Sequence, residues 1–239
     1  MTLSTLLPFV TGAILIILTL DVFRRYLVHR GAHTYTLIWA IGLTMFTLAT
    51  LSEGVLGLTW SEGAFYTWYL FGALLSAAWI GQGTVHLLFH APWVRLVTIV
   101  LAILSLAVMF ILLATPLTAD AFKTGVPISL QYGDILPKDA FVRRTTIPFN
   151  IYGTITLAGG ALWSGYLFWR KRVLPNRVIG NVLIAAGALS IATASSLARL
   201  GSGEFLALGQ LLFAVLIYVG FVQASKPAAV EGAAATPAA

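Results

Sequence analysis

Four histidines have the spacing that metal ligands often show on a helix. His29 and His33, and again His86 and His90, are four residues apart, so each pair would share one helical face. A four-histidine metal site is conceivable, but a glycine interrupts the first pair, and the nearby acid, Asp21, lies two helical turns away. We expect solvated histidines at a membrane surface, with a metal site or a pH-sensing cluster as alternatives. The sequence predicts no cofactor.

Glu53 and Arg199 place opposite charges near the ends of two apolar segments. Charges inside a membrane are costly, so they are functional candidates by default. If the two halves of the chain are related by a repeat, the two positions are equivalent and could face each other. A Glu53–Arg199 pair would close the outer mouth of the protein or hold a zwitterionic ligand. Alternatively, each side chain extends separately to the lipid headgroups.

The segment 65–89 combines aromatic and amide side chains with many small residues. On an α-helix Trp68, Gly72, Trp79 and Gln82 fall near one face, and the small residues allow other helices to approach closely. This pattern is compatible with the wall of a ligand pocket. The alternative is a packed helix in which Gln82 bonds to Gln210 or Asn181. The predicted ligand-binding residues are therefore Glu53, Arg199, Trp68, Tyr69, Trp79, Gln82 and Gln210.

The amino-acid composition indicates that these residues belong to a chain surrounded mainly by lipid. Of 239 residues, 59% are hydrophobic and 9% are charged, and the mean hydropathy is +0.93. A soluble domain needs far more charge, and a disordered chain needs far less hydrophobicity, so both classes are excluded. The chain has no cysteine, which excludes disulfides and thiolate metal sites. The net charge of +6 does not indicate nucleic acid, because the basic residues adjoin apolar segments.

Seven segments are long and apolar enough to cross a bilayer as helices, so we expect an all-α, multi-pass protein of the cell membrane. Continuous apolar runs exclude the alternation of a membrane β-barrel. The predicted spans are roughly 5–28, 35–58, 65–89, 93–115, 147–169, 177–199 and 204–224. Residues 1–225 form one domain, and the Ala- and Pro-rich tail 226–239 is expected to be disordered in the cytoplasm.

The distribution of Lys and Arg predicts that the N-terminus is outside and the C-terminus is cytoplasmic. The inner side then carries nine basic and two acidic residues, a balance of +7, and the outer side carries five basic and six acidic residues, a balance of −1. Aromatic residues near the span ends are expected to form an interfacial belt, at Trp60, Trp68, Tyr69, Trp93 and Trp169.

The first and last three spans share an order of features that predicts an internal repeat. Pro8-Phe9 and Pro148-Phe149 open the first span of each triplet, and Glu62 and Glu204 lie in similar Gly/Ser turns. The expected plan is 3+1+3, with repeat A at about 5–90, a linker helix at 93–115, an outer loop at 116–147 and repeat B at 147–224. This resembles the parallel repeats of sugar-permease-type transporters in architecture only.

The outer loop 116–147 is too long to be a simple connection. Its segments 128–132 and 140–142 flank Gly133-Asp134, a turn signal, so a small hairpin could form there. The loop could cover an outward-facing pocket or contact a partner, or it could rest as an amphipathic segment on the outer leaflet.

Three functions remain open from the sequence. The first, which we favour, is a non-enzymatic protein that binds or senses a small or lipidic ligand in an outward-facing pocket and passes its state to a separate partner protein. The second is a small-solute carrier with alternating access between the two triplets. The third is a membrane hydrolase that uses a histidine-bound metal, which lacks an assigned acid or base apart from Asp21.

Overall fold

The computed structural model describes residues 3–29, 33–172 and 174–226. Among these residues every regular element is a helix. The predicted tail at 227–239 lies outside the described residues, as do Arg30 and Glu231 of the charge count and the glycine that interrupts the first histidine pair. The expected all-α class is confirmed for the part of the chain that the structure describes.

Ten α-helices, two π-helical segments and two short 3-10 turns make up the described chain. The α-helices are α1 (Leu3–Val28), α2 (Thr34–Leu56), α3 (Glu62–Thr67), α4 (Ser76–Leu88), α5 (Trp93–Leu113), α6 (Ile128–Ile135), α7 (Phe141–Thr154), α8 (Gly160–Arg170), α9 (Pro175–Arg199) and α10 (Leu206–Ser225). The π-helical segment η1 (Trp68–Leu75) joins α3 to α4, and η3 (Ile155–Gly159) joins α7 to α8. The 3-10 turns are η2 (Ala119–Ala121) and η4 (Gly203–Phe205).

Six helices in the described chain are long and apolar enough to cross a membrane, which makes the chain a multi-pass membrane protein. They are Thr5–Val28, Thr34–Leu56, Glu62–Leu88, Trp93–Leu113, Pro175–Arg199 and Gly203–Ser225. Each coincides with a span expected from the sequence. The seventh expected span, 147–169, lies within the continuous rod α7–η3–α8, which is helical but is not one of these six.

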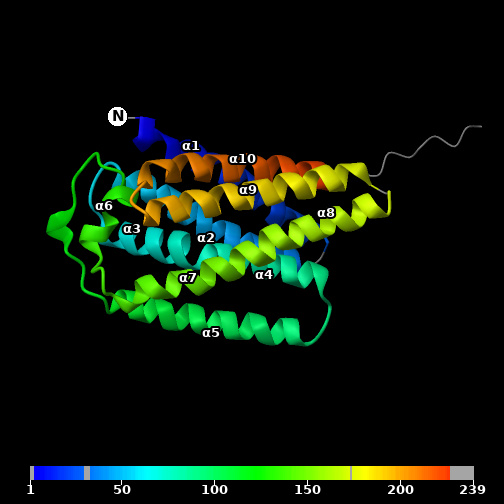
Figure 1. Ribbon diagram of the computed structural model, residues 1–239, viewed down its shortest axis with the longest axis horizontal. Helices are drawn as coiled ribbons and strands as arrows, with labels where there is room; N and C mark the ends of the chain where they lie inside the picture. The colour runs from blue at the N-terminus through cyan, green and yellow to red at the C-terminus, as the bar shows by residue number, and fades with distance from the viewer. Residues whose placement is uncertain (1–2, 30–32, 173, 227–239) are drawn as a thin grey trace, which may run out of the picture.

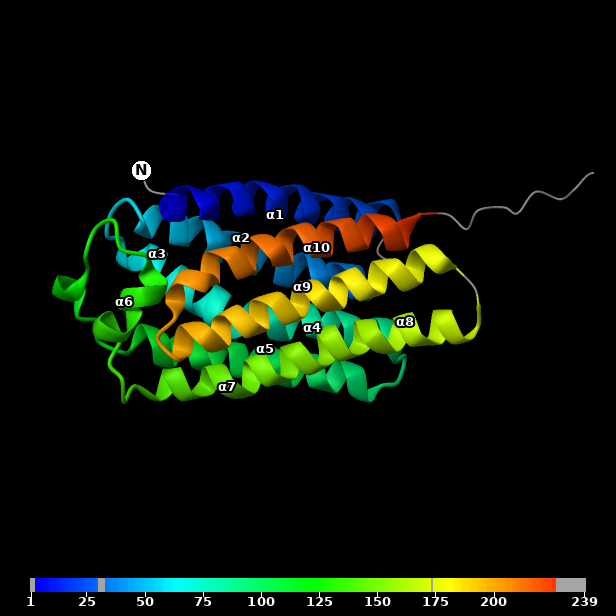
Figure 2. The ribbon, with the colours of Figure 1, turned by 45° about the horizontal axis from the view of Figure 1, so that its top comes forward.

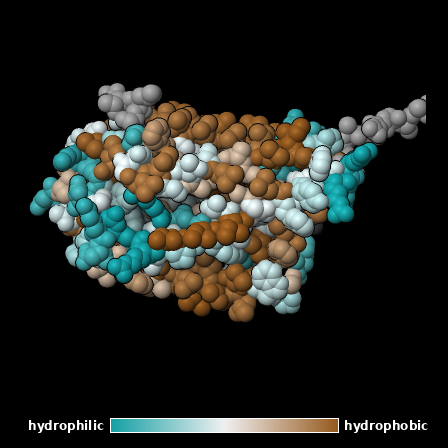
Figure 3. Space-filling model, in the orientation of Figure 1, coloured by the Kyte–Doolittle hydropathy of each residue, from teal (hydrophilic) through white to brown (hydrophobic). Residues whose placement is uncertain are grey.

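The long helices run side by side along the longest axis of the molecule, and their connections gather at its two ends (Figures 1 and 2). One end, which we call the loop end, holds the start of α1, the connection 57–61, the long segment 114–140 and the turn 200–205. The opposite end holds the starts of α2, α5 and α9. Figure 3 shows hydrophobic residues over the middle of the bundle and hydrophilic residues towards both ends, the pattern of a bilayer protein.

The long segment at the loop end contains a helix at the place where the sequence allowed a small hairpin, so the hairpin interpretation is wrong. Residues 128–135 form α6, and α7 already begins at Phe141. The Gln131 amide holds the preceding turn, because its Nε2 donates to the Val126 and Lys123 carbonyls at 2.7 and 3.0 Å and its Oε1 accepts from Lys123 N at 2.7 Å. Ser129 Oγ donates to the Gly203 carbonyl at 2.9 Å, which fixes α6 against the start of α10.

Small residues let the helices of the bundle approach closely where they cross. At the crossing of α4 and α7, a Cβ added to Gly153 would lie 2.3 Å from the carbonyl carbon of Ala77. Gly180 and Gly220 meet in the same way where α9 crosses α10. A side chain at any of these positions would push two helices apart, so the glycines set the distance between the rods.

We therefore expect Gly153→Ala to destabilise the protein by about 1–3 kcal/mol, because the added methyl group overlaps the α4 backbone. Gly159→Ala is the matched control, since a Cβ at Gly159 meets nothing within 4 Å. Loss of tryptophan-monitored native fluorescence on heating in detergent gives the apparent melting temperatures. An equal melting temperature for the two variants would contradict the close crossing.

Candidate functional site

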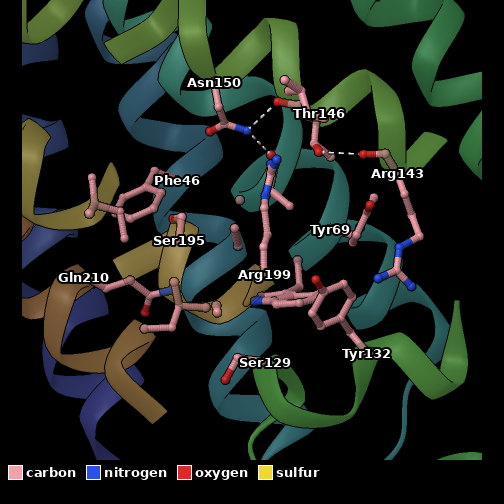
Figure 4. A pocket seen from close by; sticks show the side chains of 18 residues that line it. Phe46, Tyr69, Ser129, Tyr132, Arg143, Thr146, Asn150, Ser195, Arg199 and Gln210 are labelled. Atoms are coloured by element: carbon pink, nitrogen blue, oxygen red, sulfur yellow. Dashed lines mark hydrogen bonds between the residues drawn. The ribbon is translucent and has the colours of Figure 1, made fainter. Parts of the chain in front are cut away.

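A cavity at the loop end, which we call the main cavity, is lined by side chains from several helices (Figure 4) and has a volume of about 270 Å³. Its walls come from α2, η1, α7, α9 and α10, and α6 contributes Ser129 and Tyr132. The lining residues are Phe46, Ala49, Trp68, Tyr69, Gly72, Ala73, Ser129, Tyr132, Arg143, Thr146, Ile147, Asn150, Ile191, Ser195, Ala198, Arg199, Leu206 and Gln210. The helix of the long loop thus forms part of a pocket that the other helices leave open.

Two guanidinium groups line this cavity, from Arg143 on α7 and Arg199 on α9. None of the described residues that line it is an aspartate or a glutamate. The Arg143 guanidinium stacks over the Tyr132 ring at 5.0 Å and donates to the Leu136 carbonyl at 3.1 Å, so α6 and its following turn hold this cation in place. The cavity is positively charged and partly aromatic.

A buried carboxylate lies behind the cavity wall. Glu53 on α2 is only 5% exposed. Its Oε2 accepts hydrogen bonds from Trp68 Nε1 at 3.2 Å and from Gln210 Nε2 at 2.6 Å. The Glu53–Arg199 pair that the sequence allowed is not formed in the described chain, because Glu53 points into the bundle towards η1 and α10 while Arg199 is exposed at the end of α9.

Gln210 connects this buried carboxylate to the cavity. Its side chain is 5% exposed, lines the cavity and donates to Glu53 through Nε2. Its Oε1 is buried and accepts no hydrogen bond from the described residues. Buried acceptors in native proteins are nearly always satisfied by protein, water or ligand, so Gln210 Oε1 is an unsatisfied acceptor in a residue that lines the cavity.

The structure divides the predicted pocket wall of 65–89 between two sites. Trp68 and Tyr69 line the cavity, but Trp79 Nε1 donates to Ser105 Oγ of α5 at 3.1 Å, and Gln82 Nε2 donates to Thr98 Oγ1 of α5 at 2.8 Å. The π-helical segment η1 explains the division, because its wider turns rotate all following residues relative to an α-helix.

The expected partners of Gln82 are wrong for the same reason. Gln82 is completely buried and bonds neither to Gln210 nor to Asn181 in the described chain. Its Nε2 also donates to the Val94 carbonyl at 3.1 Å, and its Oε1 accepts from the Tyr152 hydroxyl. Gln82 therefore ties α4 to α5 and α7 and does not contact the cavity.

The predicted aromatic belt is also divided. Trp68 and Tyr69 are 5% and 3% exposed and lie inside the bundle, so their placement in the belt is wrong. They are buried because their rings pack with Phe65 and with Tyr132 of α6. Trp93 and Trp169 are exposed near helix ends, as expected for residues at an interface.

The two histidine pairs lie in different surroundings. The rings of His29 and His33 are 4.9 Å apart at the opposite end of the bundle. His86 Nε2 is hydrogen-bonded to Thr98 Oγ1 at 2.8 Å. Among the described residues, no group of three or more His, Cys, Asp or Glu side chains could hold a metal ion. The nearby acid Asp21 instead accepts from the Tyr218 hydroxyl at 3.4 Å.

Several cavity residues were not selected from the sequence. Arg143, Tyr132 and Ser129 lie in the predicted loop, where nothing indicated that they face the bundle. Asn150 had a usable signal, since it is an amide inside the predicted span 147–169. Its Nδ2 donates to the Ala73 and Thr146 carbonyls, each at 2.7 Å (Figure 4).

Comparisons of the chain with protein-family models, with curated proteins and with solved structures give no match. The chemistry of the cavity is therefore the basis for a functional assignment.

We expect Glu53→Ala and Gln210→Ala to be energetically coupled, by about 1 kcal/mol, because each variant breaks the same buried hydrogen bond. Apparent melting temperatures of the two single variants and the double variant measure this coupling. The control combines Glu53→Ala with Arg199→Gln, whose effects should be additive within about 0.5 kcal/mol. If Glu53→Ala were instead coupled to Arg199→Gln and not to Gln210→Ala, the hydrogen bond would be contradicted and the Glu53–Arg199 ion pair supported.

Proposed function

We propose that this protein is a non-enzymatic membrane protein that binds a small or lipidic ligand in the cavity at the loop end. The observation that carries this proposal is the cavity itself, in which aromatic rings, two cations and the free Gln210 Oε1 converge. Small-molecule sites are typically concave, largely apolar and supplied with a few placed polar groups. The contribution of Ser129 and Tyr132 from α6 supports a covering role for the long loop.

We further propose that the chain crosses the cell membrane seven times, with the loop end outside and the C-terminus in the cytoplasm. The continuous rod α7–η3–α8 supplies the seventh crossing. The balance of Lys and Arg over acidic residues supports this orientation, because it is greatest among the residues assigned to the opposite end. That basic end is the surface from which the ligand-bound state would pass to a separate partner.

A carrier is the second candidate, and a chain of cavities favours it. A second cavity of about 40 Å³ shares Phe46 and Ser195 with the main cavity. A third, of about 70 Å³, shares Ile80 and Leu157 with the second and continues towards Phe221, near the opposite end. The three lie between helices of the two proposed triplets, where alternating access would open a path.

The rings of Phe46 and Phe213 pack edge to face within this chain of cavities, with their centroids 4.8 Å apart. Both residues line the second cavity, which is the smallest of the three. A binding protein keeps this constriction closed, whereas a carrier opens it in each cycle. The proposed 3+1+3 repeat would supply the symmetry for such a cycle, with α5 as the linker.

The natural absence of cysteine allows a direct test of the outward-facing cavity. We expect Ser195→Cys, in the cavity wall, to react with a membrane-impermeant, negatively charged methanethiosulfonate added on the N-terminal side. The cation pair should attract the anionic reagent, so a cationic reagent of similar size should react more slowly. A Cys at Ser195 that stays unlabelled in the folded protein would refute the proposed site.

Ser164→Cys separates the binding protein from the carrier, because Ser164 is buried in the wall of the third cavity. In a binding protein we expect this thiol to stay unlabelled from the N-terminal side. In a carrier, inward-facing conformations expose it to reagent on the opposite side. Labelling rates measured in oriented proteoliposomes, with reagent on one side at a time, discriminate between the two.

A further inference from the structure

A groove on the outside of the bundle adjoins the main cavity. It has a volume of about 390 Å³ and lies between α7 and α9. Four residues line both spaces, namely Ile147, Asn150, Ser195 and Arg199. The groove and the cavity are therefore neighbours that share one wall, and Arg199 lies where they meet.

The groove has an apolar wall that the bundle leaves uncovered. Ile147, Ile151 and Ile155 follow one another along the α7–η3 rod and are 51%, 55% and 65% exposed. Side chains exposed on a membrane helix contact lipid hydrocarbon. At the other end of the same rod, Gly165 brings α8 into contact with Asn181 of α9. The two rods thus pack together towards the opposite end and leave the groove near the loop end.

The charges in the cavity select one kind of occupant. Arg143 and Arg199 both line it, and none of its described lining residues is acidic. Neither guanidinium meets an acidic residue in the described cavity lining, where Arg143 is half-buried and Arg199 is exposed, and guanidinium groups pair best with carboxylates and phosphates. Gln210, whose side chain is 5% exposed, adds the acceptor Oε1, which has no hydrogen-bond partner among the described residues.

We propose that the ligand is a single-chain amphiphile with an anionic headgroup, a fatty carboxylate or a lysophosphatidate, which reaches the cavity sideways between α7 and α9. Arg143 and Arg199 bind the anionic head, and the acyl chain lies in the groove along Ile147 and Ile151. This inference rests on the proposed function and names the ligand class of the same cavity.

Equilibrium binding of tritiated oleate to the full chain in detergent micelles tests the headgroup. We expect Arg143→Gln and Arg199→Gln each to weaken oleate binding by about tenfold, since each removes a charge-assisted hydrogen bond. Arg144→Gln is the matched control, because Arg144 is the exposed neighbour that does not line the cavity. Arg199→Lys should retain most of the affinity by keeping the charge.

Competition identifies the source of the anion. Unlabelled oleoyl lysophosphatidate should displace oleate, whereas uncharged monoolein and inorganic phosphate should not. Of oleate and lysophosphatidate, the stronger competitor defines the headgroup. Displacement by phosphate alone would overturn the amphiphile, and equal displacement by monoolein would overturn the requirement for an anion.

The path between α7 and α9 is tested by the rate of binding. Ser196→Trp places a large ring in the groove without entering the main cavity. We expect it to slow oleate association at least about tenfold. Thr193→Trp is the control, because Thr193 is exposed on α9 and lines neither space. Equal association rates for the two variants would overturn the lateral path.

Absence of saturable oleate or lysophosphatidate binding, together with a reactive Ser195→Cys thiol, would overturn this inference and leave the proposed cavity intact. An unreactive thiol would remove the proposed function itself. Size-exclusion profiles and apparent melting temperatures like those of the unaltered chain establish that each variant is folded.

Discussion

The hydrogen bonds of the Glu53 carboxylate are the interaction on which the loop end of this bundle depends. One carboxylate oxygen accepts from Trp68 on η1 and from Gln210 on α10, so it joins two consecutive rods to a third that lies 157 residues further along the chain. A carboxylate surrounded by protein and lipid is stable only with such partners. The same bonds orient Trp68 and Gln210, both of which line the cavity. The shape of the cavity is thus coupled to the way a single buried acid is satisfied.

The bundle is asymmetric along its axis. Towards the middle, glycines such as Gly81 and Gly153 let rods touch backbone to backbone. At the loop end the π-helical turn of η1 and the large side chains around it replace this close packing. The cavity forms where close contact stops, and α6 contributes to its wall, held there by the hydrogen bond to Gly203 and by the packing of Arg143 over Tyr132. Structure and proposed chemistry therefore meet at the same end of the molecule.

A cationic cavity beside an apolar groove suits a molecule with an anionic headgroup and an apolar chain. Water-soluble ligands would have no need of the isoleucine wall on α7, and neutral lipids would leave Arg143 and Arg199 without a counter-charge. In the proposed complex, the anionic head replaces water around the guanidinium groups while the acyl chain stays in a lipid-like surrounding. Recognition of this kind requires no chemical step, in keeping with a binding protein or a carrier.

The sequence by itself determined that the chain is helical and embedded in a membrane, and it located six spans to within a few residues, because twenty consecutive apolar residues have few stable alternatives in water or in lipid. It also selected Glu53, Trp68, Tyr69, Arg199 and Gln210 by type, since intramembrane polar groups are rare. Only the tertiary structure decided which of these side chains form hydrogen bonds with one another. A π-helical turn, invisible in the residue pattern, turned Trp79 and Gln82 towards α5, and the helix α6 brought Tyr132 and Arg143 into a site that local spacing could not indicate, because contacts between distant segments are set by packing.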